Sequence, residues 1–400
     1  MVRISALRPY NPNNPNEFTT NPYDVIGKEE EFQLKENPNS LIQLILPDGE
    51  GEEIYNNASI AYEKFKTTSL IVQEDTPSIY VYRQESAQFS QQGLIMGIAL
   101  QDYEDGNIVK HEHTREKPLQ DRTKHIVATN VAAGLVWSVF NADREINKLI
   151  EKIKQKKPKF DFEKYGYRHL IWQETDPNII NQLSNLFKDK KVYIADGHHR
   201  AASAAEYRKT QLRKATETDK SNAPWQYLLS YVASDDQILI LPYNRVIKRL
   251  SDNVDKFLKK MEEIYKVKQV KKAFNPKKKH QLAMCIKGNW YNLIVKEKKF
   301  SSKRDSLDVA ILQDKVLGPI LGIYDIRADE NIFFVGGIQD PNSMEKYVSE
   351  KGNDIFFNLY PVDIRDLEAI SDAGGVMPPK STWFDPKLLS GLVLHDLAEK

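Results

Sequence analysis

The feature that most constrains the fold is an apolar strand that passes straight into a helix through one Asp-Gly pair. The segment is KVYIADGHHRAASAAEYRK, residues 191–209, where a strand pattern over 191–195 is followed at once by an Ala-rich helix pattern. Gly197 permits the sharp turn and a close approach of a ligand to the backbone. A loop between such a strand and helix usually faces a cleft. The chain is therefore expected to contain a sheet with packed helices and a cleft at the end of this strand.

The order of the other elements predicts an α+β (mixed α/β) fold with a mixed sheet. Three consecutive strand patterns, at residues 77–84, 92–100 and 106–114, precede a region in which helices and strands alternate. An Asp105-Gly106 pair predicts a hairpin between the last two of these strands. A plain doubly wound sheet would alternate from its start. Further helices are expected at 58–73, 118–130, 143–155, 176–187 and 198–214, and further strands at 135–141, 167–173 and 191–195.

Three regions are expected along the chain. Residues 1–40 are rich in Pro and Asn but carry apolar residues that can dock, so they predict an ordered arm lying on the body. Residues 41–225 predict a core domain that contains the Asp-Gly box. Residues 226–400 predict an additional C-terminal α+β region with two adjacent strands at 226–243, a helix at 256–267, a hairpin at 280–300 and a strand at 332–337. The lysine-dense segment at 256–279 is expected to be a solvated face.

Composition excludes several classes of protein. The 400 residues carry 57 Lys and Arg against 56 Asp and Glu, so a net charge of +1 gives no reason to expect a nucleic-acid or membrane-surface partner. Apolar stretches fall far short of the roughly 20 residues of a membrane span, and the N-terminus lacks a signal-peptide pattern. A cytoplasmic protein is expected, and a homo-oligomer is compatible with the sequence. The single cysteine, Cys285, excludes an intramolecular disulfide and predicts a buried, inert thiol.

The residues that follow the 191–195 strand have the chemistry of a phosphate site. Arg200 can bind a phosphate bidentately, His198 and His199 can donate to its oxygens, and the first amides of a helix favour an anion. Asp196 can hold a magnesium ion or orient a nucleophile. The alternative is an ordinary helix with Asp196 as N-cap and a solvated first turn. Two of the chain's 8 histidines beside an arginine favour the phosphate site.

A second polar segment, residues 107–130, contains a candidate general base. On a strand, His111 and His113 would face one way and Glu112 the other, with Glu112 able to accept or orient a hydroxyl proton. A solvated glutamate at a strand end is the alternative. A histidine metal site is weaker, because the chain lacks HExxH and adjacent histidines on a helix lie about 100° apart. The common glycine-rich nucleotide motifs are also absent from the sequence.

Three motifs in this order resemble a known family. They are PYDVI at 22–26, ADGHHR at 195–200 and MPPKSTWFDPKL at 377–388, and they resemble the domain of unknown function family numbered one thousand and fifteen. The string HEHT…DR at 111–122 resembles that family's HExT…R segment. The DGHHR box is also similar to that of free L-serine kinases of the ParB/sulfiredoxin superfamily. There the box binds nucleotide phosphates and an upstream glutamate acts on the serine hydroxyl.

The resemblance implies a ParB/sulfiredoxin-like core and a small-molecule kinase. Such an enzyme would transfer a phosphoryl group from ATP or ADP, with Mg²⁺, to a hydroxylated metabolite, with free L-serine as the first candidate. Its partners would be a small-molecule substrate and a nucleotide. This chain is longer than a minimal serine kinase and has its own arm and C-terminal region, which leaves the acceptor open.

The resemblance also implies a role for each residue of the box. Catalytic roles are expected for Glu112, Asp196 and His199. Phosphate or nucleotide binding is expected for Gly197, His198 and Arg200, and Asp196 is also the expected Mg²⁺ ligand. The alternative is a nucleotide-binding regulatory protein of the ParB kind without kinase activity, and a metal-dependent hydrolase comes third.

Overall fold

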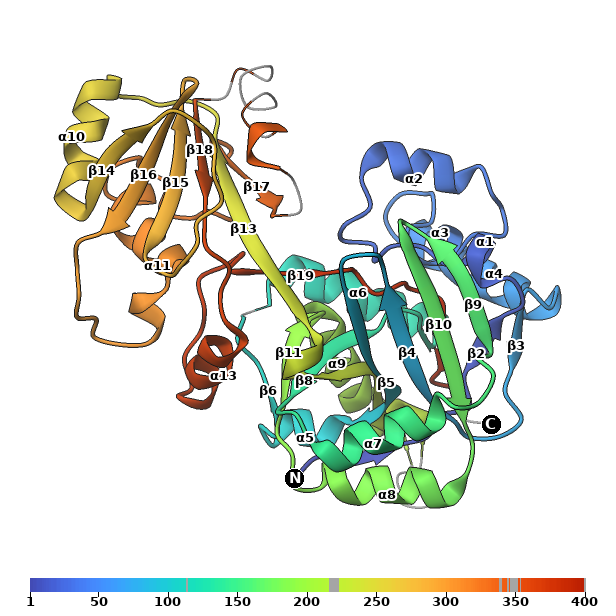
Figure 1. Cartoon of the computed structure of the whole chain (residues 1–400). Coiled ribbons are helices and arrows are strands. Elements are labelled where there is room, and N and C mark those ends of the chain that lie inside the picture. Colours follow the sequence, from blue (N-terminus) through green and yellow to red (C-terminus); the bar gives the residue numbers. More distant parts are fainter. Residues whose placement is uncertain are drawn as a thin grey trace. The chain divides into compact units, whose positions relative to one another are not determined.

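The computed structural model describes residues 1–112, 114–215, 223–337, 340–343, 345, 352 and 354–398. The chain divides into two compact units, and most of their helices and strands are labelled in Figure 1. Unit 1 comprises Met1–Ile238 and Pro386–Lys400, and unit 2 comprises Leu239–Asp385. The last residues of the chain therefore return to unit 1, whereas the sequence predicts them in the third region, residues 226–400.

Unit 1 is built on a nine-stranded sheet. Its strand order is β6-β11-β8-β12-β5-β4-β10-β9, with β1 paired to β5. Strand β11 pairs parallel with β6 and antiparallel with β8, so the sheet is mixed. The predicted α+β fold with a mixed sheet is confirmed. The strands are β1 (Ile4–Ser5), β4 (Ile79–Glu85), β5 (Ser90–Ala99), β6 (Ile108–Val109), β8 (Val136–Phe140), β9 (Phe160–Lys164), β10 (Tyr167–Glu174), β11 (Val192–Asp196) and β12 (Tyr227–Ser234).

Helices α7 and α8 lie along one face of this sheet (Figure 1). Their isoleucine, leucine and phenylalanine side chains are buried in one core cluster with side chains of the strands. Both helices begin where the sequence predicts, because Asp143 and Asp176 accept hydrogen bonds from first-turn amides. The helices of unit 1 are α1 (Pro15–Phe18), α2 (Lys28–Lys35), α3 (Ile42–Ile45), α4 (Glu53–Thr67), α5 (Leu100–Glu104), α6 (Glu116–Thr129), α7 (Arg144–Ile153), α8 (Pro177–Phe187) and α9 (His198–Lys214).

The two ends of the chain pack together in unit 1. Strand β2 (Tyr10–Pro12) pairs with β3 (Ile71–Gln73), and β7 (Val131–Ala132) pairs with β20 (His395–Asp396). The buried Asn11 side chain donates to the Leu392 carbonyl at 2.8 Å, and Thr20 and Ser390 form a backbone bridge. We call residues 386–398 the C-terminal strap. The N-terminal arm thus lies on the body of unit 1 with the strap beside it.

Unit 2 contains a seven-stranded sheet of order β14-β16-β15-β18-β13-β17, with β19 paired to β13. The predicted hairpin is formed by β15 and β16. The Cys285 thiol in β15 is buried, and burial raises its pKa to about 11, as expected for an inert cysteine. The elements are β13 (Leu239–Ile247), α10 (Val254–Ile264), β14 (Tyr265–Val270), β15 (Gln281–Ile286), β16 (Asn289–Val295), α11 (Asp308–Leu312), β17 (Ile332–Gly336), β18 (Ile355–Asn358), α13 (Ile364–Asp372) and β19 (Thr382–Asp385).

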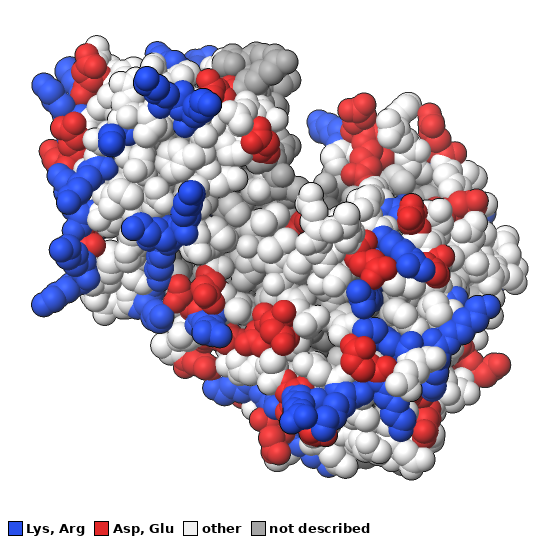
Figure 2. Space-filling view, in the orientation of Figure 1, with Lys and Arg blue, Asp and Glu red and all other residues white. Residues whose placement is uncertain are grey.

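The lysine-dense segment covers α10 and the edge strand β14. Its side chains include the exposed Lys256, Lys259, Lys266 and Lys268. Lysines on an edge strand oppose pairing with another chain. In unit 1, basic and acidic side chains are intermixed on the face shown in Figure 2, in keeping with the near-neutral net charge.

Several local predictions are wrong, among them the end of the helix expected at 256–267, where Tyr265–Val270 forms strand β14. Helix α4 ends at Thr67, and Ile71–Gln73 is a strand. The expected strand at 106–114 is reduced to the two residues of β6. The Asp105-Gly106 pair ends α5 instead of turning a hairpin, with Gly106 at φ +78°, as a glycine after a helix commonly is. The two strands expected side by side at 226–243, β12 and β13, belong to different sheets.

No described helix is long and apolar enough to cross a bilayer.

Candidate functional site

The predicted box is formed where β11 ends and α9 begins. Strand β11 ends at Asp196 after an irregularity in its pairing with β8, and α9 begins at His198. Gly197 lies between them with φ +95°, a conformation that side chains rarely adopt. A Cβ atom at this position would lie 3.0 Å from Nε of Arg200. Glycine therefore suits both the turn and the placement of the Arg200 guanidinium beside it.

Asp196 is not the N-cap of α9, which decides against the ordinary helix-start interpretation. The N-cap residue is Gly197, and no side chain caps this helix. The Asp196 carboxylate instead lies 3.4 Å from Nη2 of Arg200 and 3.7 Å from Nζ of Lys387. Burial acts to raise the pKa of Asp196, but the charges of Lys387 and Arg200 outweigh it and hold the pKa well below its ordinary value. Asp196 is therefore an ionised carboxylate between two cations.

Lys387 reaches Asp196 from the C-terminal strap. The strap is fixed here by two buried glutamines of the sheet: Gln84 donates to the Lys387 carbonyl at 2.9 Å and Gln91 to the Pro386 carbonyl at 3.0 Å. Gln91 also donates to the side-chain oxygen of Gln84 at 2.7 Å. The backbone around Lys387 is thereby held against β4 and β5.

The first histidine of the box packs against the second polar segment. The rings of His198 and His111 lie edge to face, with centroids 4.5 Å apart, and both side chains are buried. Burial lowers the pKa of His111 to about 4 and that of His198 well below its usual value, so both are neutral near pH 7. Among the described residues, Nδ1 of His111 and Nε2 of His198 have no hydrogen-bond partner.

Glu112 lies on a loop held against the box on both sides. His111 packs on His198, and the backbone N–H of Arg115 donates to Nε2 of His199 at 3.0 Å. Glu112 itself is half-buried. Because β6 ends at Val109, Glu112 is not on a strand, and the predicted alternation of His111 and Glu112 across one is wrong. The structure nevertheless brings this loop to the box, as the sequence-based hypothesis requires.

The N-terminal arm brings a third group of residues to the site. The Arg122 guanidinium of α6 lies 4.6 Å from the centre of the Tyr23 ring. The exposed Asp24 is close enough to act electrostatically on Arg200. Burial alone would lower the pKa of Arg200, but the Asp24 and Asp196 carboxylates raise it above its ordinary value. The PYDVI motif therefore lies at the same site as the box.

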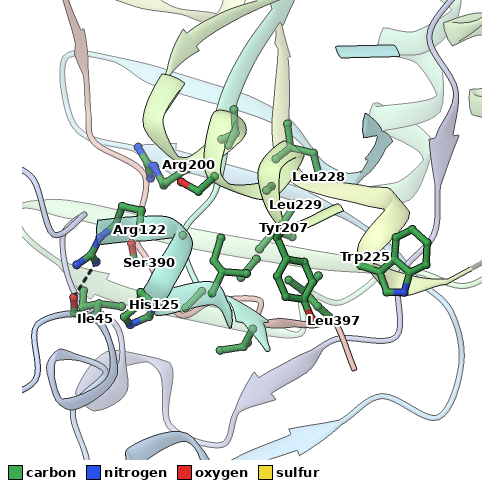
Figure 3. Close-up of a pocket in the computed structure, with 18 of the residues that line it drawn as sticks. Ile45, Arg122, His125, Arg200, Tyr207, Trp225, Leu228, Leu229, Ser390 and Leu397 are labelled. Atoms are coloured by element: carbon green, nitrogen blue, oxygen red, sulfur yellow. Dashed lines mark hydrogen bonds between the residues drawn. The ribbon is translucent and has the colours of Figure 1, made fainter. Parts of the chain in front are cut away.

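A cavity of about 70 Å³ adjoins Arg200. Figure 3 shows Arg200, Arg122 and Ser390 at one part of its wall and Tyr207, Trp225 and Leu397 at another. Most of the remaining lining is apolar, from α6, β7, α9 and β12. An anionic group bound at Arg200 would have room beside it for a small apolar part of a ligand.

The site fits a magnesium ion that is held by Asp196 together with the phosphates of a bound substrate. Mg²⁺ is usually held by one or two carboxylates together with substrate phosphates. Asp196 is ionised and can supply such a carboxylate. No group of three His, Cys, Asp or Glu side chains within the described residues could hold a metal ion by itself. His113, part of the alternative histidine metal site, lies outside the described residues.

Sequence reasoning missed Lys387, Tyr23 and Asp24 as site residues. The signal was present, because Tyr23 and Asp24 belong to the PYDVI motif and Lys387 belongs to MPPKSTWFDPKL. The structure brings two residues of the first motif and one of the second close to the box. Tyr23, Asp24 and Lys387 all belong to unit 1 and lie at the same site as the box.

Comparisons with known proteins give one family and several distant structures. A family model described as "Protein of unknown function (DUF1015)" matches residues 3–310. No curated protein matches the chain. A free serine kinase variant in complex with AMP shares 11% identity at a TM-score of 0.38, covering 72% of this chain and 87% of that chain.

Two further solved structures resemble the chain at a similar distance. A conserved hypothetical protein from Pyrococcus furiosus shares 13% identity at a TM-score of 0.36, covering 76% of this chain and 97% of that chain. SbnI with a C-terminal truncation, from Staphylococcus aureus, shares 11% identity at a TM-score of 0.38, covering 74% of this chain and 85% of that chain.

Proposed function

The chain belongs to the family described as Protein of unknown function (DUF1015), and we propose that this member is a small-molecule kinase. It would transfer the terminal phosphoryl group of ATP or ADP to the hydroxyl of a metabolite, with free L-serine as the first candidate acceptor. The observation that carries the proposal is the ionised Asp196 beside Arg200 at the start of α9, with the Glu112 loop packed against the same turn.

Positioning and charge neutralisation are the main requirements of phosphoryl transfer. The first amides of α9 and the Arg200 guanidinium would hold the terminal phosphates of the donor. Gly197 lets the donor approach the backbone. Mg²⁺, when bound with the donor, would supply charge neutralisation at the phosphates, and Asp196 is the residue that would hold it.

Glu112 would act on the acceptor. As the acceptor oxygen forms its bond to phosphorus, the bond from phosphorus to the bridging oxygen of the donor breaks, and Glu112 accepts the hydroxyl proton. The nucleoside phosphate leaves with the electron pair of the broken bond. His199 accepts a hydrogen bond from the Arg115 backbone and would position the loop that carries Glu112.

The proposal gives His198 a supporting role. Its Nε2 atom is enclosed and its ring packs on His111, so a phosphate contact through that atom would require the pair to open. We therefore assign His198 to the support of the Glu112 loop, in place of the phosphate contact expected from the sequence.

A phosphate-transfer screen tests the function. Purified protein is incubated with ATP or ADP, Mg²⁺ and a panel of hydroxylated metabolites, and products are identified by mass spectrometry. A phosphorylated product supports the kinase. Nucleotide binding without any product across the panel would favour the regulatory alternative, and absence of nucleotide binding would contradict the proposal.

Glu112→Gln separates chemistry from binding. Because this change keeps the shape but removes the base, turnover should fall about 10²–10⁴-fold while nucleotide affinity stays near that of the wild type. Glu116→Gln, at an exposed glutamate at the start of α6, is the matched control and should keep full turnover. Wild-type turnover in Glu112→Gln would show that another residue is the general base.

A further inference from the structure

We propose that Lys387, on the C-terminal strap, contacts the phosphoryl group being transferred and acts beside Arg200 as a cation of the phosphate site. This inference rests on the proposed kinase function and adds to it a catalytic residue outside the DGHHR box. It also assigns a role to the MPPKSTWFDPKL motif, which the box chemistry alone leaves unexplained.

The first support is the way in which Lys387 is held. Its side chain is only 14% exposed, whereas lysines are mostly exposed in folded proteins. Restricting a lysine side chain opposes folding through lost rotamer freedom. The fold nevertheless fixes the peptide groups of Pro386 and Lys387 with two fully enclosed glutamines, Gln84 and Gln91. The ammonium group is thereby directed to the end of β11.

The second support is the balance of charge around the box. The Asp196 and Asp24 carboxylates act on Arg200, and the loop that carries Glu112 packs against the same turn. Arg200 and the Arg122 guanidinium beside Tyr23 are two cations against these three carboxylates, so the charge here stays negative without Lys387. A nucleotide brings several more negative charges, so a further cation beside Arg200 favours the binding of its terminal phosphate.

A purely structural role is the competing explanation. Lys387 could serve only to neutralise Asp196, in which case its removal would lower stability and leave the affinity of the folded protein for anions unchanged. The proposal predicts instead that the folded variant without Lys387 loses anion affinity and turnover. An arginine at the same position should restore part of both. The two explanations therefore differ in what the folded variants bind.

The test compares Lys387→Met, Lys387→Arg and the control Lys148→Met in the full chain. Lys148 is an exposed α7 lysine in an ion pair with Glu145, so its removal leaves the site untouched. Affinities for pyrophosphate and for ATP are measured by calorimetry, together with turnover of any acceptor found in the screen. Lys387→Met should weaken pyrophosphate binding at least about tenfold, Lys387→Arg should recover part of the loss, and Lys148→Met should match the wild type.

The outcomes separate this inference from the function on which it rests. Wild-type pyrophosphate and ATP affinity in folded Lys387→Met would overturn the role of Lys387 and leave the kinase proposal standing. Failure of the wild type itself to bind either compound would overturn both. If Lys387→Met does not fold, Asp196→Asn is compared with the double variant Asp196→Asn/Lys387→Met. In the double variant, the loss of Lys387 leaves no carboxylate unpaired at position 196. Equal pyrophosphate affinity in that pair would overturn the inference.

Discussion

At the scale of single residues, a carboxylate at the end of a strand can cap the next helix or face a ligand. Asp196 does not cap α9, because Gly197 occupies that position. Its contacts are Arg200 within its own turn and Lys387 from the strap. A carboxylate that is kept ionised beside two cations can organise both a metal ion and the cationic side chains around a phosphate.

Arg200→Ala tests the phosphate-binding role directly. We expect nucleotide binding to weaken by about 1.5–3 kcal/mol, the scale of a charge-assisted hydrogen-bonded pair. The control is Arg213→Ala, at an exposed arginine in the last turn of the same helix. Calorimetric titration with ATP measures both variants. Equal affinity of Arg200→Ala and wild type would remove Arg200 from the phosphate site.

The residues that the sequence could and could not predict differ in how they reach the site. His198, His199 and Arg200 follow Asp196 and Gly197 directly, so strand and helix geometry place them together whatever the rest of the fold does. Lys387 lies almost two hundred residues from Asp196 in the sequence and approaches it only because Gln84 and Gln91 hold the strap. No local sequence pattern predicts the contact between Lys387 and Asp196. Only the MPPKSTWFDPKL motif indicated that this segment matters.

At the scale of elements, the site depends on the turn between β11 and α9. Gly197→Ala should be destabilising, because a non-glycine residue in a left-handed conformation costs about 1–3 kcal/mol. It should also displace Arg200, whose Nε would lie 3.0 Å from the new Cβ. We therefore expect both a lower melting temperature and weaker nucleotide binding.

Gly106→Ala is the matched control for that change. Gly106 has φ +78°, and a Cβ atom there would meet nothing within 4 Å. The control should lose a similar amount of stability by thermal denaturation but keep its nucleotide affinity. If both variants bind nucleotide equally well, the placement of Arg200 above Gly197 does not matter for binding.

The helix and strand that form this turn were predictable, whereas the neighbouring β6 was not. Strand β11 and helix α9 have long, uninterrupted patterns, and α9 spans His198–Lys214 as the sequence indicates. The β-branched Ile108 and Val109 form β6, and the polar Lys110, His111 and Glu112 after them are not in a strand. Burial of His111 against His198 is a tertiary contact, and it prevails over the local strand preference.

At the scale of the whole molecule, the two units hold buried titratable groups with opposite linkage to pH. In unit 1, burial lowers the pKa of His111, His125, His169 and His395 to about 4. In unit 2, burial raises the pKa of Asp308 to about 7, although its carboxylate accepts the His280 backbone N–H. The histidines favour their neutral form in the folded state, and so does Asp308.

The signs follow from which state binds more protons. Between about pH 4 and 6.5 the unfolded histidines bind protons that the folded ones do not, so unit 1 loses stability as the pH falls through this range. Between about pH 4 and 7 the folded Asp308 binds a proton that the unfolded one does not, so unit 2 loses stability as the pH rises through this range. A difference of two pKa units corresponds to about 3 kcal/mol for one group.

Hydrogen exchange followed by mass spectrometry measures the two units separately in the full chain. From pH 7 to pH 4.5, corrected for intrinsic exchange rates, we expect protection to fall in the core strands of unit 1 and to rise in β14, β15 and β16 of unit 2. Asp308→Asn is the control for unit 2. It cannot titrate, so its unit 2 protection should be independent of pH over this range, while the response of unit 1 is unchanged. Protection that falls in both units on acidification, with Asp308→Asn behaving as wild type, would show that Asp308 does not govern the response of unit 2.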